Sequence, residues 1–368
     1  MKIVIQYTKI YYLTPQNNIV DMQNNDNFWM QRCLDIAQRA AGNTFPNPMV
    51  GAVIVHNNEL LAEGWHKKAG TEHAEVAAMN NLAPNAIALL PQAQMYVTLE
   101  PCAHFGRTAP CADMLVQSGI GKVIIGTLDP YPLVAGKGLK KLLQGGVQVK
   151  FGVLQRECET LNKRFFCAIK NQLPYVVLKW AQTANGFFAP ETPQAYWISN
   201  ALSRRLVHRW RSEEQAILVG GNTVLADNPQ LTNRYWYGNQ PTKVLIDTHG
   251  NLAETAAVFA ADTHTLVVCP PHTRAYPHAE QVYTEDFSPQ NILAILQQKN
   301  IQSVLIEGGA KTLQAFINAN SWNEARIIIA ENTYWEKGIF APKLSLRAQK
   351  TNRLLDNRIE YFYNDSLK

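Results

Sequence analysis

The residues best suited to chemistry in this sequence are one histidine, one glutamate and two cysteines. His73 and Glu75 stand two positions apart, and Cys102 and Cys111 each follow a proline. One histidine and two cysteines are ligands that suit zinc, and three protein ligands leave a fourth position for water. Zinc lowers the pKa of such a water toward neutrality, which makes the water a nucleophile at physiological pH. The pattern therefore predicts a catalytic zinc site.

Glu75 is the predicted proton carrier of this site. It can take a proton from the water and pass it to a ring nitrogen and to the departing amine of a substrate. Zinc deaminases of nucleobases combine such an H-x-E pair with a later P-C-x-x-C. Here eight residues, rather than two, separate Cys102 from Cys111, so the second ligand lies across a loop. Cys111 opens a predicted helix, where the helix dipole favours a thiolate.

Two alternatives to a small-molecule deaminase remain open at this point. A purely structural zinc would need a fourth ligand, which His104 could supply. A deaminase that edits nucleic acid would need a basic stripe with interleaved aromatic residues and would bind RNA in a salt-dependent way. The net charge of +5 is dispersed along the chain and forms no Lys/Arg block, so we expect no nucleic-acid partner.

The elements that must position these residues alternate between strands and helices. Apolar residues recur at helical spacing from Asn27, and Gly42 ends that helix. Further expected elements are a strand in PNPMVGAVIV, a helix in HAEVAAM, a strand in MYVTLEP, a helix in PCADMLVQSG, a strand in KVIIGTL, a helix in GLKKLLQ and a strand in VQVKFGV. This alternation predicts a sheet covered by helices that closes near residue 150.

A second α/β series follows a predicted connecting helix at residues 155–170. Its expected strands are PYVVLKWAQ, AILVG, KVLID, TLVVC, SVLIE and ARIIIA, with a loop at 183–196 and helices at 199–211, 288–300 and 310–319. Glycine pairs after two of these strands, in LVGGNTVLADNPQLTNR and LIEGGAKTL, would let the backbone approach a phosphate. Taken alone, such pairs are equally compatible with simple turns.

Composition narrows the class of protein further. Hydrophobic residues make up 46% and charged residues 17%, which is typical of a well-packed globular protein. Six cysteines in 368 residues are too few for a disulfide framework, which predicts a reducing compartment, the cytoplasm. No apolar run approaches the roughly 18 residues needed to cross a bilayer, so we expect no membrane partner. The polar first 25 residues predict a disordered extension, with Met22 as the expected true start.

Several of these segments resemble one family along most of the chain, from about residue 27 to about residue 365. TLEPCAHFGRTAPCADML, DPYPLVAGKG, PNPMVGAVIV and GWHKKAGTEHAEV are similar to the deaminase half of the bifunctional riboflavin-biosynthesis deaminase–reductases. The resemblance implies an α/β protein with a cytidine-deaminase-like three-layer domain followed by a dihydrofolate-reductase-like domain. The implied boundaries are a disordered extension at 1–25, a zinc deaminase domain at 26–153, a linker helix at 154–173 and a reductase domain at 174–368.

The resemblance also implies the two reactions and the partners. The first is the hydrolytic deamination of a diaminopyrimidinone ribosyl phosphate, and the second is the NADPH-dependent reduction of its ribosyl group to ribityl. The partners are therefore zinc, NADPH and a small phosphorylated pyrimidine, and analogy with paired domains of this type predicts a homo-oligomer. The alternative is an active deaminase fused to an inactive reductase domain.

Carried over residue by residue, the resemblance implies a pocket for the deaminase substrate. Asn47 and His66 would surround the pyrimidine and the ribose. Arg107, between the two zinc cysteines, would bind the phosphate, which a guanidinium holds in a fork geometry. Asp129 matches the acid of the family's DPNP segment, which reads DPYP here, so that Tyr131 replaces an asparagine.

For the second domain the resemblance rests on PYVVLKWAQTANG, YWIS, RWRSEEQAILVGGNTVLADNPQLTNR and LIEGGA. It implies that Lys179 is the catalytic lysine near the reacting sugar. The implied NADPH contacts are Ala181, Trp197, Thr223, Asp227 and the stretch that begins at Gly309. The implied substrate contacts are Arg211, Leu231, Arg234 and Glu307.

This half departs from the family pattern at three places. Asn185 replaces the acid of an S-x-D-G segment, Ala195 replaces a common serine, and the strand RIIIAENTYWEKG lacks the usual Pro-Lys. The loss of one hydrogen bond costs roughly 0.5–1.5 kcal/mol, which is too little to abolish binding. We therefore expect an active reductase.

Overall fold

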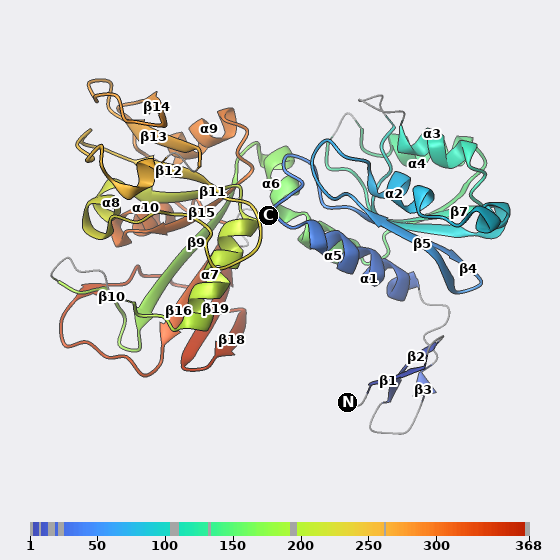
Figure 1. Ribbon diagram of the computed structural model, residues 1–368, viewed down its shortest axis with the longest axis horizontal. Coiled ribbons are helices and arrows are strands. Elements are labelled where there is room, and N and C mark those ends of the chain that lie inside the picture. The colour runs from blue at the N-terminus through green and yellow to red at the C-terminus, as the bar shows by residue number, and fades with distance from the viewer. Residues whose placement is uncertain are drawn as a thin grey trace. The chain divides into compact units, whose positions relative to one another are not determined.

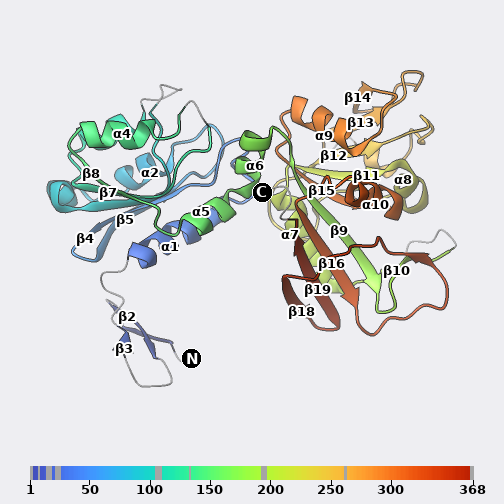
Figure 2. The same cartoon turned by 180° about the vertical axis from the view of Figure 1, so that it is seen from behind.

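The structure is a computed structural model that describes residues 3–6, 9–13, 19–20, 26–103, 110–131, 134–191, 197–260 and 263–364. The chain divides into two compact units, Met1–Phe166 and Cys167–Lys368, which Figure 1 and Figure 2 show from opposite sides. The division falls inside helix α6 (Lys163–Asn171), within the predicted linker at 154–173. The predicted domain boundaries stay predictions.

The first unit is built on a five-stranded sheet. Its strands are β4 (Gly51–His56), β5 (Glu59–Trp65), β6 (Gln94–Leu99), β7 (Lys122–Thr127) and β8 (Gln148–Phe151). They lie in the order β5-β4-β6-β7-β8, in which β6, β7 and β8 are parallel and β4 is antiparallel to both of its neighbours. Before this sheet come the short strands β1 (Ile3–Gln6), β2 (Lys9–Leu13) and β3 (Ile19–Val20).

Helices cover both faces of this sheet (Figure 1). On one face lie α1 (Asp26–Ala37) and α5 (Gln155–Leu161), and on the other lie α2 (Ala74–Asn80), α3 (Cys111–Gln117) and α4 (Lys137–Gln144). Successive strand residues point to opposite faces, so Val53 packs into the core under α1 and α5 and Ile54 into the core under α2, α3 and α4. The result is the expected three-layer arrangement. Two short 3₁₀ helices, Gln38–Ala40 and Pro84–Gln92, extend the connections.

The second unit contains a nine-stranded sheet in the order β14-β13-β12-β11-β15-β9-β16-β19-β18. Its strands are β9 (Tyr175–Thr183), β11 (Ala216–Gly220), β12 (Thr242–Ile246), β13 (Thr265–Cys269), β14 (Ala279–Tyr283), β15 (Ser303–Gly308), β16 (Glu324–Ala330), β18 (Lys350–Leu354) and β19 (Asn357–Tyr363). The strands from β14 to β16 are parallel, and β19 and β18 continue the sheet as an antiparallel pair. β10 (Phe187–Ala189) and β17 (Ile339–Phe340) form a separate pair.

Helices cover both faces of this sheet as well. α7 (Ala201–Glu213) and α8 (Gly221–Asp227) pack on one face, through Val207, Trp210 and Val224, while α9 (Pro289–Gln298) and α10 (Ala310–Asn318) pack on the other. The predicted α/β class is confirmed in both units. Among the residues that the structure describes, no helix combines the length and the apolarity needed to span a bilayer.

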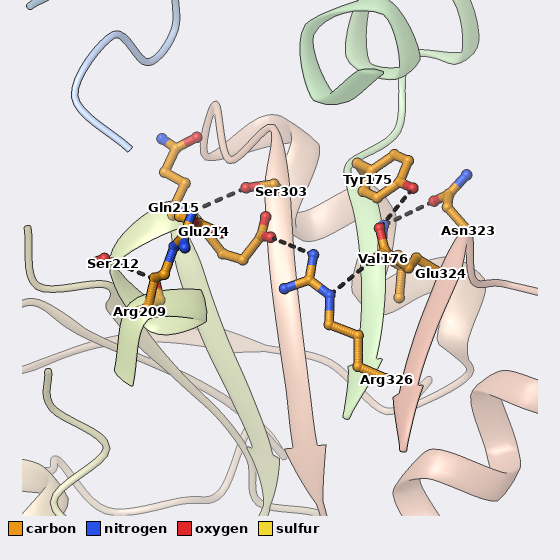
Figure 3. A network of polar contacts seen from close by, with 11 residues as sticks. Tyr175, Val176, Arg209, Ser212, Glu214, Gln215, Ser303, Asn323, Glu324 and Arg326 are labelled. Carbon is orange, nitrogen blue, oxygen red and sulfur yellow. Dashed lines mark hydrogen bonds and ion pairs between the residues drawn. The ribbon is translucent and has the colours of Figure 1, made fainter. Parts of the chain in front are cut away.

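A buried polar network lies at the amino-terminal ends of the central strands of the second sheet (Figure 3). Arg326 donates to Glu324 at 2.8 Å and lies 3.6 Å from Glu214, and the hydroxyl of Tyr175 donates to Glu324 at 3.2 Å. Tyr175, Ser303 and Glu324 are the first residues of three adjacent parallel strands, which places the network at one end of the sheet. The glycine-containing turns after β11 and β15 lie at the opposite, carboxyl end, where ligands of open α/β sheets usually bind.

Candidate active sites

The three predicted zinc ligands come from three different elements of the first unit. His73 is the residue that caps the start of α2, Cys102 lies just after β6, and Cys111 is the first residue of α3. Nδ1 of His73 lies 3.2 Å from Sγ of Cys111 and 3.7 Å from Sγ of Cys102. Atoms bound about 2.0–2.3 Å from one tetrahedral zinc lie roughly 3.5 Å apart. The donor set and its spacing therefore fit zinc.

The two thiols strongly perturb one another. Hydrogen bonding from the Cys111 thiol, aided by His73, lowers the pKa of Cys102 to about 4. The backbone N–H of Cys111 also donates to Sγ of Cys102 at 3.3 Å. The same thiol–thiol contact, together with burial, raises the pKa of Cys111. Both sulfurs can be thiolates only beside a cation, which is what a bound divalent metal supplies.

Glu75 lies in the first turn of α2 and is only 4% exposed. Burial raises the pKa of its carboxyl to about 7, although His73 opposes the rise. An acid–base group is most useful when its pKa lies near the working pH. Glu75 therefore has the burial and the position, two residues from a predicted metal ligand, that a proton carrier needs.

His66 lies beside the predicted ligand His73, and Asn47 contacts His66. Nδ1 of His66 is 2.9 Å from the carbonyl oxygen of Glu72, and Nε2 is 3.2 Å from the amide nitrogen of Asn47. A proton on Nδ1 satisfies both contacts, because Nε2 can then accept from the amide. Burial lowers the pKa of His66, in keeping with a neutral ring, and the ring meets that of His73 edge to face at 5.7 Å.

The structure describes only some of the remaining predicted residues of this site. Arg107 and His104 fall outside the described residues. Asp129 follows β7, and its carboxylate accepts the backbone N–H of Tyr131 at 2.8 Å. Tyr131 is 45% exposed.

Sequence reasoning missed Glu100, a buried carboxylate that precedes Pro101 and Cys102. It accepts the backbone N–H of Asp129 at 3.2 Å. An acidic residue at the end of an otherwise apolar strand was the available signal, because such a residue is rarely buried without partners.

Three predicted residues of the second unit form a buried ionic cluster. Lys179 lies on β9, Glu307 on the adjacent strand β15, and Arg211 near the end of α7. Arg211 binds both carboxylate oxygens of Glu307, with two hydrogen bonds of 2.8 Å, and Nζ of Lys179 is 3.7 Å from the same carboxylate. This fork geometry fixes the guanidinium and the carboxylate in one plane.

The charges of this cluster favour the ionised forms of Glu307 and Arg211. Burial opposes ionisation of Glu307, but Arg211 and Lys179 outweigh it and lower its pKa to about 2. Burial, joined by the charge of Arg211, lowers the pKa of Lys179 although Glu307 acts in the other direction. The two cations share a single carboxylate, so the cluster carries a net positive charge that suits an anionic substrate.

The segment 230–234 is held against this cluster by α7. Arg211 donates to the carbonyl of Thr232 at 3.0 Å, and Nδ1 of His208 accepts the backbone N–H of Arg234 at 2.9 Å. Burial and the nearby Arg211 lower the pKa of His208 to about 4, which keeps its ring neutral. Leu231 is buried with a φ of 55°. Sequence reasoning missed His208, although it stands one helical turn before Arg211.

Gly309 lies in a cradle that fits a phosphate. It caps the start of α10 without a side chain. A Cβ at Gly309 would lie 3.1 Å from the hydroxyl of Thr223, and one at Gly308 would lie 3.5 Å from it. The bare backbone at the start of a helix offers unpaired N–H groups to an anion, which fits the pyrophosphate of NADPH.

The structure joins the other predicted cofactor residues, Ala181, Trp197 and Asp227, to different neighbours. Ala181 packs with the core that contains Val207, and Trp197 is 64% exposed with the Arg204 guanidinium 4.8 Å from its ring. Asp227 ends α8, and burial raises its pKa. These contacts join none of the three to Gly309.

Asn185 has a local structural role. Its amide donates to the carbonyl of Trp335 at 2.7 Å, and its oxygen accepts the hydroxyl of Thr183 at 2.8 Å. Ala195 lies outside the described residues.

Comparison with known proteins extends to both units. Residues 23–127 match the family described as the cytidine and deoxycytidylate deaminase zinc-binding region, and residues 174–332 match the RibD C-terminal domain. The chain is 37% identical to the riboflavin biosynthesis protein RibD of Aquifex aeolicus over 330 residues, covering 88% of this chain and 91% of that protein. It is 39% identical to the RibD protein of Synechocystis over 293 residues, covering 77% and 78%.

Two solved structures are similar over nearly the whole chain. One is a diaminohydroxyphosphoribosylaminopyrimidine deaminase/5-amino-6-(5-phosphoribosylamino)uracil reductase from Thermotoga maritima, with a TM-score of 0.85, 33% identity and coverage of 92% of this chain and 98% of that chain. The other is RibD from Acinetobacter baumannii, with a TM-score of 0.83, 33% identity and the same coverage.

Proposed function

The chain belongs to the family of the riboflavin biosynthesis protein RibD, and we propose that the residues described above carry out both reactions of that family. It is a bifunctional enzyme of riboflavin biosynthesis, with a zinc-binding deaminase domain of the cytidine-deaminase type and an NADPH-dependent reductase domain of the dihydrofolate-reductase type. The alternative of a reductase domain that has lost its activity is not favoured, since the similarity extends through both domains.

In the first reaction the proposed substrate is 2,5-diamino-6-(5-phosphoribosylamino)pyrimidin-4-one. The proposal rests on one observation: the ligand atoms of His73, Cys102 and Cys111 lie close together, and the buried Glu75 is two residues from His73. Bound zinc would supply a water with a lowered pKa. Glu75 would then carry two protons in turn, one from that water to the ring nitrogen and one from the added hydroxyl group to the departing amine.

The other residues of the first site bind and orient the substrate in this proposal. Asn47 and His66 offer hydrogen-bonding groups to the pyrimidine and the ribose. Arg107 and Asp129 contact the phosphate and the sugar.

In the second reaction the proposed substrate is the deaminated ribosyl phosphate. Arg211, Arg234 and Leu231 hold it, and the proposed catalytic Lys179, kept in place by Glu307, holds a proton beside the reacting sugar. NADPH would supply the hydride to the opened ribose carbon. Gly309 and Thr223 offer the phosphate cradle for NADPH, and Ala181, Trp197 and Asp227 complete the proposed cofactor contacts.

We also propose that the enzyme acts on small molecules in the cytoplasm as a homo-oligomer. None of the six cysteines, all of which the structure describes, forms a disulfide, which suits a reducing compartment. Light scattering on the purified protein tests the oligomeric state, and a single-chain mass would contradict it.

Product analysis by mass tests the two activities. The purified chain is incubated with the diaminopyrimidinone ribosyl phosphate, with and without NADPH. We expect the deaminated product alone without NADPH and the ribityl product with it. A reaction that stops at the deaminated product despite NADPH would contradict the second activity.

The Glu75→Gln variant tests the proton carrier. We expect deamination to fall by about 10²–10⁴-fold while zinc content and reduction of the deaminated intermediate stay unchanged, because the amide cannot carry the proton. Deamination at the unaltered rate would refute this role of Glu75.

A further inference from the structure

Glu100 joins the zinc-ligand segment to the loop and helix that follow β7. Glu100 is buried, with 6% of its surface exposed, and stands two positions before Cys102. One carboxylate oxygen accepts the backbone N–H groups of Asp129 at 3.2 Å and of Gly136 at 2.9 Å, and the other accepts that of Leu139 at 3.0 Å. All three donors belong to the backbone of residues 129–139.

Through these bonds Glu100, which is not part of α4, caps the amino-terminal end of that helix. The first N–H groups of a helix lack partners within the helix, and a side-chain oxygen of the capping residue usually accepts one of them. The capping residue of α4 is Gly136, which has no side chain to do so. The Glu100 carboxylate accepts from Leu139, the third residue of α4, and its negative charge also favours the positive end of the helix dipole.

The start of α4 also packs directly on the ligand segment. A Cβ at Gly138 would lie 2.0 Å from the carbonyl oxygen of Pro101 and 3.2 Å from the side chain of Glu100. Only a glycine permits this approach. The backbone before Cys102 is therefore held to Asp129 and to the start of α4 by hydrogen bonds and by close packing.

We propose that Glu100 is a positioning residue of the deaminase site, which sets the location of Asp129 relative to the zinc ligand Cys102. The proposal rests on the proposed role of Asp129 as a substrate contact. In this role Glu100 acts through its hydrogen bonds to the backbone of Asp129, Gly136 and Leu139, rather than through contact with the metal or the substrate. Its loss displaces a binding group and leaves the metal ligands and Glu75 in place.

The Glu100→Gln variant of the full chain tests this role. The glutamine side chain has the same size, but an NH2 group replaces one carboxylate oxygen. That NH2 group faces a backbone N–H group and cannot accept a hydrogen bond from it. We expect the deaminase KM to rise about tenfold with kcat within about threefold, since small displacements of a binding group weaken binding. Zinc content and the reductase rate of the same chain remain unchanged. Glu59→Gln, an exposed carboxylate on β5, is the matched control and leaves KM unchanged.

A double-mutant cycle separates positioning from a general structural effect. If Glu100 acts through Asp129, Glu100→Gln raises KM much less in an Asp129→Asn background than in the wild type. Equal effects in both backgrounds, a fall in kcat at constant KM, or a loss of zinc would each overturn the proposal.

Hydrogen exchange on the wild-type chain gives an independent readout if the variant does not fold. The Gly136 and Leu139 amides should be protected, and free exchange at both would also overturn the proposal. A wild-type chain that binds zinc and protects these amides but does not deaminate would instead contradict the proposed function.

Discussion

The two candidate active sites obtain their electrostatic stabilisation in different ways. In the second unit, Arg211, Lys179 and Glu307 neutralise much of one another's charge within the fold. In the first unit the chain contributes two thiols, an imidazole and the buried Glu75, so the positive charge must come from a metal. The reductase site is thus preorganised by its own ion pairs, whereas the deaminase site is completed only by zinc.

Zinc removal should separate the two activities completely. We expect a chelator to lower deamination by more than about 10³-fold, because the nucleophilic water is lost. Reduction of the deaminated intermediate should continue at its original rate. Both activities are assayed in parallel before chelation, after chelation and after zinc is restored. A parallel fall in reductase activity would show that the metal dependence is not confined to the first site.

Glu307→Gln should have the opposite selectivity. The variant leaves two buried cations without their anion, and the loss of one partner of a buried ion pair typically costs about 3–5 kcal/mol. We expect the reductase domain to unfold at lower denaturant concentration and reduction to be lost, while deamination persists. Glu336→Gln, an exposed carboxylate in the same unit, is the control. Unchanged stability of Glu307→Gln would contradict the ionic account of this site.

Acid should weaken the reductase unit through the same carboxylate. The pKa of Glu307 is about 2 in the folded chain, against about 4.3 for a free glutamate. A depressed carboxyl pKa stabilises the fold above the unfolded value, and this contribution is lost as the pH falls from about 4.3 toward 2. The shift corresponds to about 3 kcal/mol. Denaturant titrations at pH 5 and pH 3 should show a smaller drop in Glu307→Gln than in the wild type, and equal drops would exclude Glu307 as the source.

Asn185→Asp should have the smallest effect. Restoring the acid of the family pattern removes the amide that donates to Trp335 and leaves the Thr183 contact possible. One neutral hydrogen bond contributes about 0.5–1.5 kcal/mol, so the melting temperature should fall by a few degrees with little change in the KM for NADPH. Asn251→Asp, an exposed amide after β12, is the control. A large rise in reductase activity would instead mean that Asn185 limits the chemistry.

Edge strands are among the elements that the sequence patterns missed in the fold. The buried strands β9, β11 and β15 read as near-continuous apolar runs, because both of their faces are covered by helices. β14 and β18 lie at the two edges of the sheet, with half-buried or exposed residues and no clear alternation. The loop expected at 183–196 also holds the short strand β10. β10 pairs with β17, which lies far later in the chain, whereas β14 and β18 pair with strands close to them in the sequence, β13 and β19.

Local sequence motifs were enough to predict the chemistry of the first site, because the identities of metal ligands and of an adjacent acid are local properties of a motif. His73, Glu75, Cys102 and Cys111 could be named as ligands and proton carrier without any knowledge of the fold. The elements that carry them, short helices after strands, were also readable from local periodicity.

The partners of the other charged groups, by contrast, are set by tertiary contacts and could not be predicted from local sequence. Lys179 and Glu307 meet because β9 and β15 are neighbours in the sheet, although 128 positions separate them in the chain. Glu100 acquires its three donors only when α4 packs on the segment before Cys102. A buried charge is stable only with partners, and those partners come from segments remote in the sequence. Local patterns can therefore identify the reacting groups, but the groups that hold them in place are defined by the fold.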